Sequence, residues 1–202
     1  MLNRVSHLGA CTVTATTGRI GRVKDVLFDD RSWAIRSLVV DTGRWLPGRR
    51  VLVAPTAVTQ PLRAAKDIAV SLNRRQLLGG ATHARAATGA EAELCSGNQV
   101  RGCGIRTSDG SIGCVADFVF DDVSWLLHSV VVVEPRQGLR ASRRVLIGTR
   151  WIDRIDFSGR LVHVALTRAE VRGGPAYDET APVHRDYEVR LAESYGRTGH
   201  WD

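Results

Sequence analysis

The sequence contains one sixteen-residue stretch twice, and this repetition constrains the fold more than any other feature. Residues 18–33 read GRIGRVKDVLFDDRSW, and residues 110–125 read GSIGCVADFVFDDVSW. Ten of the sixteen positions are identical at a constant offset of 92 residues. Self-similarity at a fixed offset indicates a duplicated structural unit. The chain of 202 residues is therefore expected to contain two similar domains.

The duplication sets the expected domain boundaries. A first domain is predicted at residues 1–78, an Ala- and Gly-rich flexible linker at 79–93, a second domain at 94–176 and a C-terminal tail at 177–202. The tail has an apolar residue at every fourth position, which predicts a short helix over residues 182–195. These residues are expected to dock on an apolar surface of the same chain or of a second copy in a homodimer: Val183, Tyr187, Leu191 and Tyr195.

Alternating polarity predicts that each copy is built from short β-strands. In the first copy the strands are expected at residues 10–17, 20–28, 33–41, 49–53 and 67–72. A Gly inside a strand of both copies, Gly21 and Gly113, predicts a bulge or a close backbone approach that curls the sheet. The runs Leu38-Val39-Val40 and Val130-Val131-Val132 are apolar on both faces and need cover on two sides. Thr167 and Glu170 have the spacing of a helix capping box, and residues 73–76 are a weaker counterpart.

The repeated pattern G-x-I-G-x-V-x-D-x-x-F-D-D-x-S-W resembles the PRC-barrel family, in its bacterial tandem form. Segments 45–52, 151–156, 166–170, 187–191 and 195–201 are also similar to that family. The resemblance implies an all-β protein with two tandem small antiparallel β-barrels, short helices and a helical tail. Relatives carry this barrel in the photosynthetic reaction-centre H subunit and in a factor that matures the small ribosomal subunit. It implies a non-catalytic module that docks on another macromolecule, and no particular activity.

The shared polar and aromatic residues are interpreted as the structural signature of the repeat. Its positions in the two copies are Gly21, Asp25, Asp30, Trp33, Gly113, Asp117, Asp122 and Trp125. Hydrogen bonding to backbone is expected for the aspartates, turn formation for the Asp-Asp pairs, and core packing for the tryptophans. No nucleophile elbow, phosphate loop or zinc motif is present, so no enzyme, cofactor or metal is expected. Four free thiols are expected at Cys11, Cys95, Cys103 and Cys114.

The charge leaves two classes of partner open. The formal net charge is +7, yet no run of five basic residues exists, which favours charge spread over a solvated surface. The first hypothesis is an adaptor or scaffold on a protein complex, including a membrane-associated or photosynthetic-type one. The alternative is an RNA- or ribosome-binding module that uses paired arginines: Arg49, Arg50, Arg74, Arg75, Arg143 and Arg144. The chain shows no apolar leader or membrane span, so a cytoplasmic location, or a peripheral one at the inner membrane, is expected.

Overall fold

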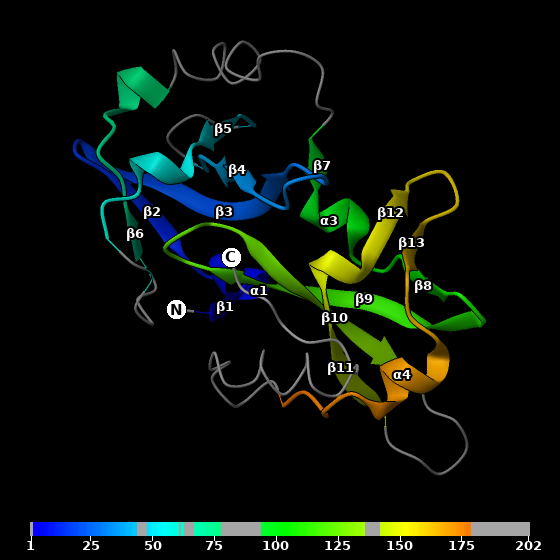
Figure 1. The fold of residues 1–202 in the computed structure, drawn as a ribbon. Helices are drawn as coiled ribbons and strands as arrows, with labels where there is room; N and C mark the ends of the chain where they lie inside the picture. The colour runs from blue at the N-terminus through cyan, green and yellow to red at the C-terminus, as the bar shows by residue number, and fades with distance from the viewer. Residues whose placement is uncertain are drawn as a thin grey trace. The chain divides into compact units, whose positions relative to one another are not determined.

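The computed structural model describes residues 2–43, 48–60, 62, 67–77, 94–135 and 142–178. The regular structure of these residues is mostly strand, arranged in two sheets with short helices, and the predicted all-β fold is confirmed (Figure 1). The chain divides into two compact units. We call residues 5–98 with 122–126 the N-terminal unit, and residues 1–4, 99–121 and 127–202 the C-terminal unit. The predicted linker at 79–93 and the tail helix at 182–195 lie outside the described residues.

The N-terminal unit is built on a sheet with the strand order β5-β4-β3-β2-β6, to which β7 adds by pairing with β3. Strand β2 pairs in parallel with β6, and the other neighbours are antiparallel. Helix α1 (Val5–Leu8) and the 3-10 turn η1 (Pro55–Ala57) complete the described unit. The strands are β2 (Thr12–Ala15), β3 (Gly18–Phe28), β4 (Ile35–Asp41), β5 (Arg50–Val53), β6 (Asp67–Ala69) and β7 (Cys95–Ser96).

The C-terminal unit repeats this arrangement with the order β11-β10-β9-β8-β13-β12, and β1 pairs with β9. Its parallel pair is β8 with β13, which corresponds to β2 with β6. The strands are β1 (Leu2–Arg4), β8 (Gly104–Thr107), β9 (Gly110–Asp121), β10 (Leu127–Glu134), β11 (Arg143–Gly148), β12 (Ile152–Asp156) and β13 (Leu161–Val164). The helical elements are η2 (Thr149–Trp151) and α4 (Arg168–Gly173), and α3 (Gly97–Val100) spans the boundary between the units.

The boundaries of the compact units differ from those of the two sequence copies. Each sheet includes one short strand that comes, in the chain, just before the copy that forms the other sheet. Strand β1 precedes the first copy but pairs with β9, so that Asn3 lies opposite Phe120. Strand β7 precedes the second copy but pairs with β3, so that Cys95 lies opposite Phe28. Asn3 and Cys95 are 92 residues apart, and so are Phe28 and Phe120. The two added strands therefore occupy equivalent positions, and the exchange of strands between the two sheets is reciprocal. Each added strand extends the pairing at the end of a long strand, where backbone groups would otherwise lie unpaired.

Gly21 and Gly113 are required to be glycine for the same structural reason. A Cβ atom at Gly21 would lie 1.8 Å from the carbonyl oxygen of Asp41, and one at Gly113 would lie 2.2 Å from that of Val133. The sheet register also shifts beside each glycine, between β2 and β3 and between β8 and β9. The predicted bulge and close backbone approach are therefore both confirmed in each copy.

The strands that are apolar on both faces are buried on both faces. Leu38, Val39 and Val40 of β4 are each at most 8% exposed. Residues 130–132 of β10 are fully buried. The described helices are short, and none is long and apolar enough to cross a membrane.

Candidate functional site

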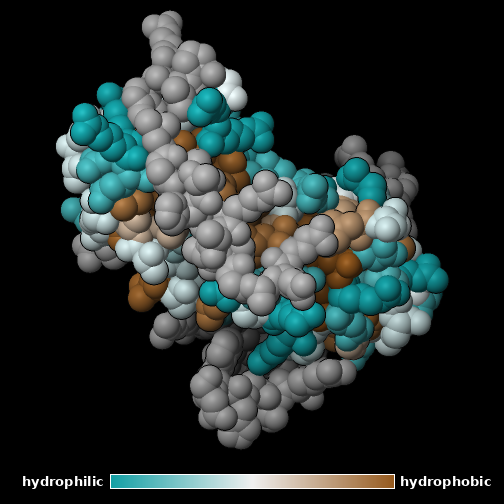
Figure 2. Space-filling model, turned by 90° about the horizontal axis from the view of Figure 1, so that it is seen from above, coloured by the Kyte–Doolittle hydropathy of each residue, from teal (hydrophilic) through white to brown (hydrophobic). Residues whose placement is uncertain are grey.

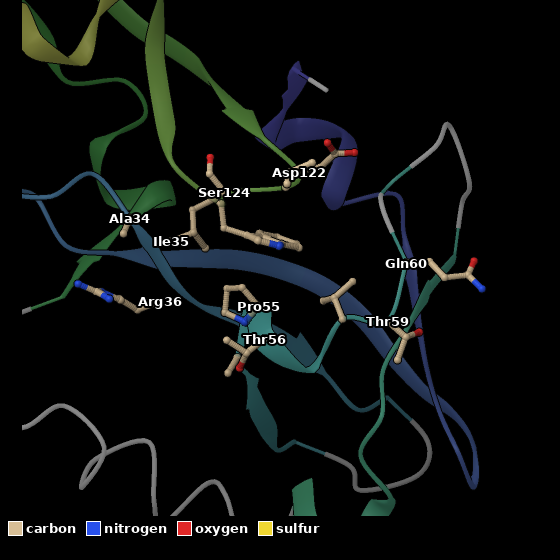
Figure 3. Close-up of a pocket in the computed structure, with 13 residues that line it drawn as sticks. Ala34, Ile35, Arg36, Pro55, Thr56, Thr59, Gln60, Asp122 and Ser124 are labelled. Atoms are coloured by element: carbon tan, nitrogen blue, oxygen red, sulfur yellow. The ribbon is translucent and has the colours of Figure 1, made fainter. Parts of the chain in front are cut away.

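A groove of about 580 Å³ lies in the N-terminal unit (Figure 3). Three segments line it: residues 34–36 at the start of β4, residues 54–60 around η1, and residues 122–125 of the β9–β10 turn. All three segments belong to the same compact unit. Ile35, Pro55 and other apolar groups supply much of the lining. A mixed groove of this size can accept a side chain or a short peptide segment.

The β9–β10 turn is held against β4 by backbone pairing. The amide of Ile35 donates a hydrogen bond to the carbonyl oxygen of Trp125 at 2.8 Å, and Ala34 forms an antiparallel bridge with Leu126. Trp125 has a positive φ of 57°, an uncommon conformation for a bulky residue. Because Trp33 in the other copy has the same φ, this conformation belongs to the repeated turn.

The two tryptophans pack as the sequence predicts. The ring of Trp33 stacks on that of Phe28 with centroids 5.6 Å apart, and Trp125 is 9% exposed. The amide of Trp33 closes its turn by donating to the carbonyl oxygen of Asp29 at 2.8 Å. Both side chains therefore serve the turn and the core around it.

The β9–β10 turn exposes apolar side chains at the groove. Large exposed hydrophobic residues among the described ones are Val123, Leu126 and Phe157, with exposed fractions of 74%, 38% and 43%. Figure 2 shows hydrophobic residues, in brown, exposed beside hydrophilic ones on one face. Single exposed hydrophobic residues are common. Val123 differs from Leu126 and Phe157 because it also lines the groove, where it offers an apolar contact.

The shared aspartates are satisfied by hydrogen bonds within their own units. The carboxylate of Asp25 accepts hydrogen bonds from the amides of Val26 at 2.8 Å and Asn98 at 3.0 Å, and from the hydroxyl of Ser96 at 2.5 Å. Asp25 thereby links β3 to residues 96–98, the segment that begins in β7.

Asp117 is buried and uses a different partner. Its carboxylate accepts from the amide of Phe118 at 2.9 Å and forms an ion pair with Arg101 at 2.6 Å. Hydrogen bonding is the role that the sequence predicts for both positions.

The acidic turn of the first copy is organised by Asp29. Its carboxylate accepts hydrogen bonds from the amides of Arg31 at 2.9 Å and Ser32 at 3.3 Å, and from the guanidinium of Arg36 at 3.3 Å. The amide of Arg31 is the main cause that lowers the pKa of Asp29 to about 2. Asp30 beside it is exposed, whereas Asp122 of the second copy is buried. Within the described ranges, no cluster of three His, Cys, Asp or Glu residues is arranged to hold a metal ion.

The six paired arginines fall into two groups. Arg49, Arg50 and Arg75 are exposed. The guanidinium of Arg143 instead donates to the carbonyl oxygens of Arg172 at 2.6 Å and Gly174, at the end of α4.

The other two paired arginines are partly buried. The guanidinium of Arg74 donates to the carbonyl oxygen of Arg19 at 2.8 Å, and Arg144 is half-buried. The equivalent pairs of the two copies therefore differ in exposure. The four tail residues of the predicted docking helix lie outside the described part of the chain.

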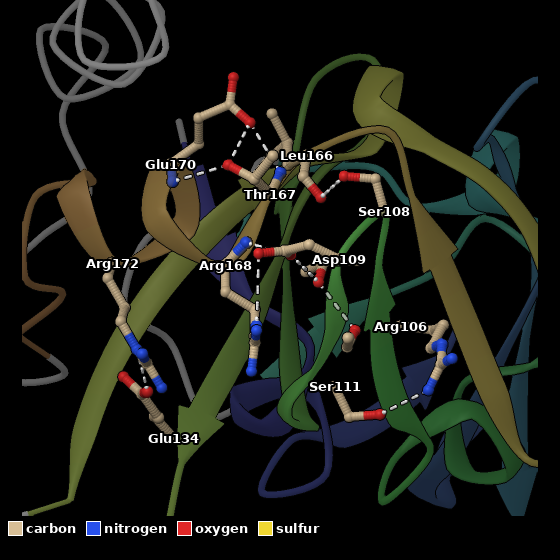
Figure 4. A network of polar contacts seen from close by, with 12 residues as sticks. Arg106, Ser108, Asp109, Ser111, Glu134, Leu166, Thr167, Arg168, Glu170 and Arg172 are labelled. Carbon is tan, nitrogen blue, oxygen red and sulfur yellow. Dashed lines mark hydrogen bonds and ion pairs between the residues drawn. The ribbon is translucent and has the colours of Figure 1, made fainter.

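A polar network in the C-terminal unit anchors α4 (Figure 4). Thr167 and Glu170 form the predicted capping box, in which the amide of Glu170 donates to the hydroxyl oxygen of Thr167 at 3.2 Å. Asp109 accepts hydrogen bonds from the amide of Arg168 and the hydroxyl of Thr107, both at 2.8 Å. These bonds, the amide of Arg168 first, lower the pKa of the Asp109 carboxyl. Since every partner is part of the fold, the network is structural.

We interpret the cysteines as structural residues as well. All four are free thiols, and three are buried. Burial raises the pKa of the Cys11 and Cys103 thiols, which disfavours the reactive thiolate. The thiols of these two residues donate to the carbonyl oxygens of His7 and Gln99, each at 3.3 Å, in the same place of each copy.

The groove is the feature that sequence reasoning missed. Its lining comes from segments 34–36, 54–60 and 122–125, which no local motif connects. One signal was present, because Val123 occupies the position of Arg31 in the repeat. The substitution replaces a charged side chain with an apolar one at a turn that lines the groove.

One comparison with known proteins identifies part of the chain. Residues 3–70 match the model of the PRC-barrel domain, so this segment contains such a domain. The matched segment begins in β1 and ends just after β6. The chain matches no curated protein.

Proposed function

We propose that this chain, in which residues 3–70 form a PRC-barrel domain, is a non-catalytic adaptor that docks on a protein complex. The second copy of the signature is taken as a second domain of the same kind. The proposed setting is the cytoplasm or the cytoplasmic face of the inner membrane, at a membrane-associated or photosynthetic-type complex. This setting rests on the resemblance to the reaction-centre H subunit alone.

The groove at the β9–β10 turn carries the proposal. Val123 is 74% exposed beside a cavity whose lining includes Ile35, Pro55 and Trp125. Exposing such a side chain to water has no stabilising effect on the folded chain, whereas burying it in an interface contributes about 1.5 kcal/mol or more. The arrangement fits a partner that offers a small apolar side chain to the groove and covers Val123.

The experiment is a quantitative pull-down from the source cell, with and without nuclease, using three baits. Wild type is compared with Val123→Glu, which places a charge at the groove, and with Phe157→Glu, which does the same at an exposed site in the C-terminal unit. We expect Val123→Glu to lose a defined set of proteins that wild type and Phe157→Glu both retain. Equal melting temperatures of the three baits exclude a folding defect. Identical capture by all three would overturn the groove as a docking surface.

A second candidate is an RNA- or ribosome-binding module. The observation that favours it is the exposure of Arg49, Arg50 and Arg75 in the unit that contains residues 5–70 of the matched segment. The nuclease arm separates the two candidates, since an RNA-mediated set of partners disappears on digestion. A steep loss of binding between low and physiological salt would also indicate phosphate contacts. The homodimer through residues 182–195 stays a prediction, and a change in solution mass on deleting residues 178–202 checks it.

A further inference from the structure

The two copies of the signature differ mainly in charge. Six of the sixteen positions are not identical, and four of these six exchange a basic residue for an uncharged one. The four pairs are Arg19 with Ser111, Arg22 with Cys114, Lys24 with Ala116, and Arg31 with Val123. Three of the four basic residues lie within one stretch of β3, so the first copy carries a local positive charge that the second lacks.

The structure brings these three cations together around a pocket of about 540 Å³ in the N-terminal unit. Arg19, Arg22 and Lys24 line it from β3, and residues 41–43 line it from the end of β4. Strict alternation along a strand would put Arg19 and Arg22 on opposite faces. The bulge beside Gly21 removes this difference, because Thr14 pairs with Arg19 while Val13 pairs with Gly21. All three cationic residues are consequently exposed, whereas Ile20 and Val23 point into the core.

The charges of the pocket are not neutralised within the described residues. Asp41 supplies the one carboxylate of the lining and lies opposite Arg22 in the sheet register. Its oxygen accepts a hydrogen bond from the amide of Gly43 at 2.9 Å. The described structure gives the side chains of Arg19, Arg22 and Lys24 no ion pair. Three cations and one carboxylate leave an excess of two positive charges in a concave site.

We propose that this pocket binds an anion that carries two or more linked phosphate groups. Guanidinium groups match phosphate oxygens in geometry, and the two arginines together with Lys24 supply both planar and point-charge donors. The volume lies within the range of small-ligand sites. None of the lining residues is aromatic, so the described pocket offers no stacking surface for a nucleobase. The phosphate groups carry the recognition, whether they belong to a free polyphosphate or to a phospholipid headgroup. The proposal uses none of the groove residues and is independent of the adaptor function.

The test is titration calorimetry of the full chain with sodium tripolyphosphate at physiological ionic strength. Arg22→Gln removes the central cation, and Arg154→Gln is the matched control on an exposed position of β12. A triple variant, Arg19→Ser with Arg22→Cys and Lys24→Ala, gives β3 the residues of β9. We expect saturable binding to wild type and to Arg154→Gln, an association constant reduced about ten-fold or more in Arg22→Gln, and no binding to the triple variant.

A second arm separates the two sources of phosphate. The same proteins are sedimented with phosphatidylcholine vesicles that contain diacylglycerol pyrophosphate, a lipid whose headgroup carries two linked phosphates. Binding to vesicles alone, lost in the triple variant, supports the pocket with a lipid headgroup as its ligand. Binding to tripolyphosphate alone, lost in the same variant, supports a free anion. The proposal is overturned if wild type binds neither probe, or if Arg154→Gln weakens binding as much as Arg22→Gln does. Unchanged melting temperatures show that the exposed substitutions leave the fold intact.

Discussion

Strands β3 and β9 carry the same signature, and their differences separate what the fold needs from what it leaves free. Gly, Ile, Val, Asp and Phe recur at the positions that approach a backbone, fill the core or accept structural hydrogen bonds. The exposed positions of β3 are cationic, whereas the corresponding positions of β9 are uncharged, and two of them are half-buried. The duplicated core therefore supports two different surfaces. Binding properties that differ between the two units are expected at the exposed positions where β3 and β9 differ in sequence.

The largest effect is expected where the two strands agree, at the shared glycines. Gly21→Ala and Gly113→Ala each place a Cβ within 2.2 Å or less of a carbonyl oxygen, so the paired strand has to move. We expect each substitution to cost about 3 kcal/mol or more of unfolding free energy, measured by urea denaturation. Gly173→Ala is the control, because a Cβ there meets nothing within 4 Å. Equal stability of Gly21→Ala and Gly173→Ala would contradict the close approach.

The shared aspartates should show the next largest effect and should differ between the units. The Asp117 side chain is 6% exposed and is the ion-pair partner of Arg101. We expect Asp117→Ala to lower the free energy of unfolding by about 3 kcal/mol, because it leaves Arg101 without this partner. Asp25→Ala removes hydrogen bonds from a half-buried site, and we expect about 1–2 kcal/mol. Thermal unfolding of both variants, with the exposed Asp30→Ala as control, measures the difference. A larger loss for Asp25→Ala would reverse our ranking of the two sites.

The local features of the fold could be predicted from the sequence, because their causes are local. The Gly21 bulge, the strand β3 and the Thr167 capping box each depend on a few adjacent residues. The exchange of β1 and β7 could not be predicted in this way. These strands have three and two residues, too few to show periodicity, and their partners lie in the other copy.

The surface was harder to predict for a related reason. The bulge changes which residues of β3 share a face, so Arg19 and Arg22 line the same pocket although strict alternation would place them on opposite faces. Arg143 looks like Arg49 in the sequence, but its guanidinium is occupied by the carbonyl groups at the end of α4. The availability of a charge depends on tertiary contacts, and the repeat pattern alone contains no information about them.

The helix caps allow a finer comparison of the two copies. Thr167→Ala breaks a capping box in which side chain and backbone groups of Thr167 and Glu170 bond to each other, and we expect a loss of about 1 kcal/mol. Asn73 and Gln76 make the equivalent reciprocal bonds, both at 2.9 Å, so Asn73→Ala should cost a similar amount. Urea denaturation measures both, with Thr167→Ser as the variant that keeps the hydroxyl. A loss in Thr167→Ser equal to that in Thr167→Ala would argue against the cap as the cause.

The smallest effect concerns acid stability and depends on the turn of the first copy. The pKa of Asp29 is about 2 in the folded chain, below its ordinary value of 3.8, mainly because the amide of Arg31 donates to the carboxylate. A folded pKa below the unfolded one means that the ionised carboxylate stabilises the fold above about pH 4 and loses this effect as the pH falls toward 2. Asp29→Asn should therefore be less stable than wild type at pH 6, and its melting temperature should fall less between pH 5 and pH 2.

A control variant separates the backbone donor from the charge of the neighbouring side chain in this experiment. Arg31→Val gives the turn the residue that the second copy carries at Val123, and it keeps the amide that bonds to Asp29. We expect Arg31→Val to retain the wild-type dependence of melting temperature on pH, since the amide and not the guanidinium is the main cause of the shift. If Arg31→Val and Asp29→Asn lose the acid dependence equally, charge accounts for it, and the two copies of the turn differ in electrostatics as well as in surface. If only Asp29→Asn loses it, the backbone of the repeated turn is sufficient to hold the carboxylate ionised.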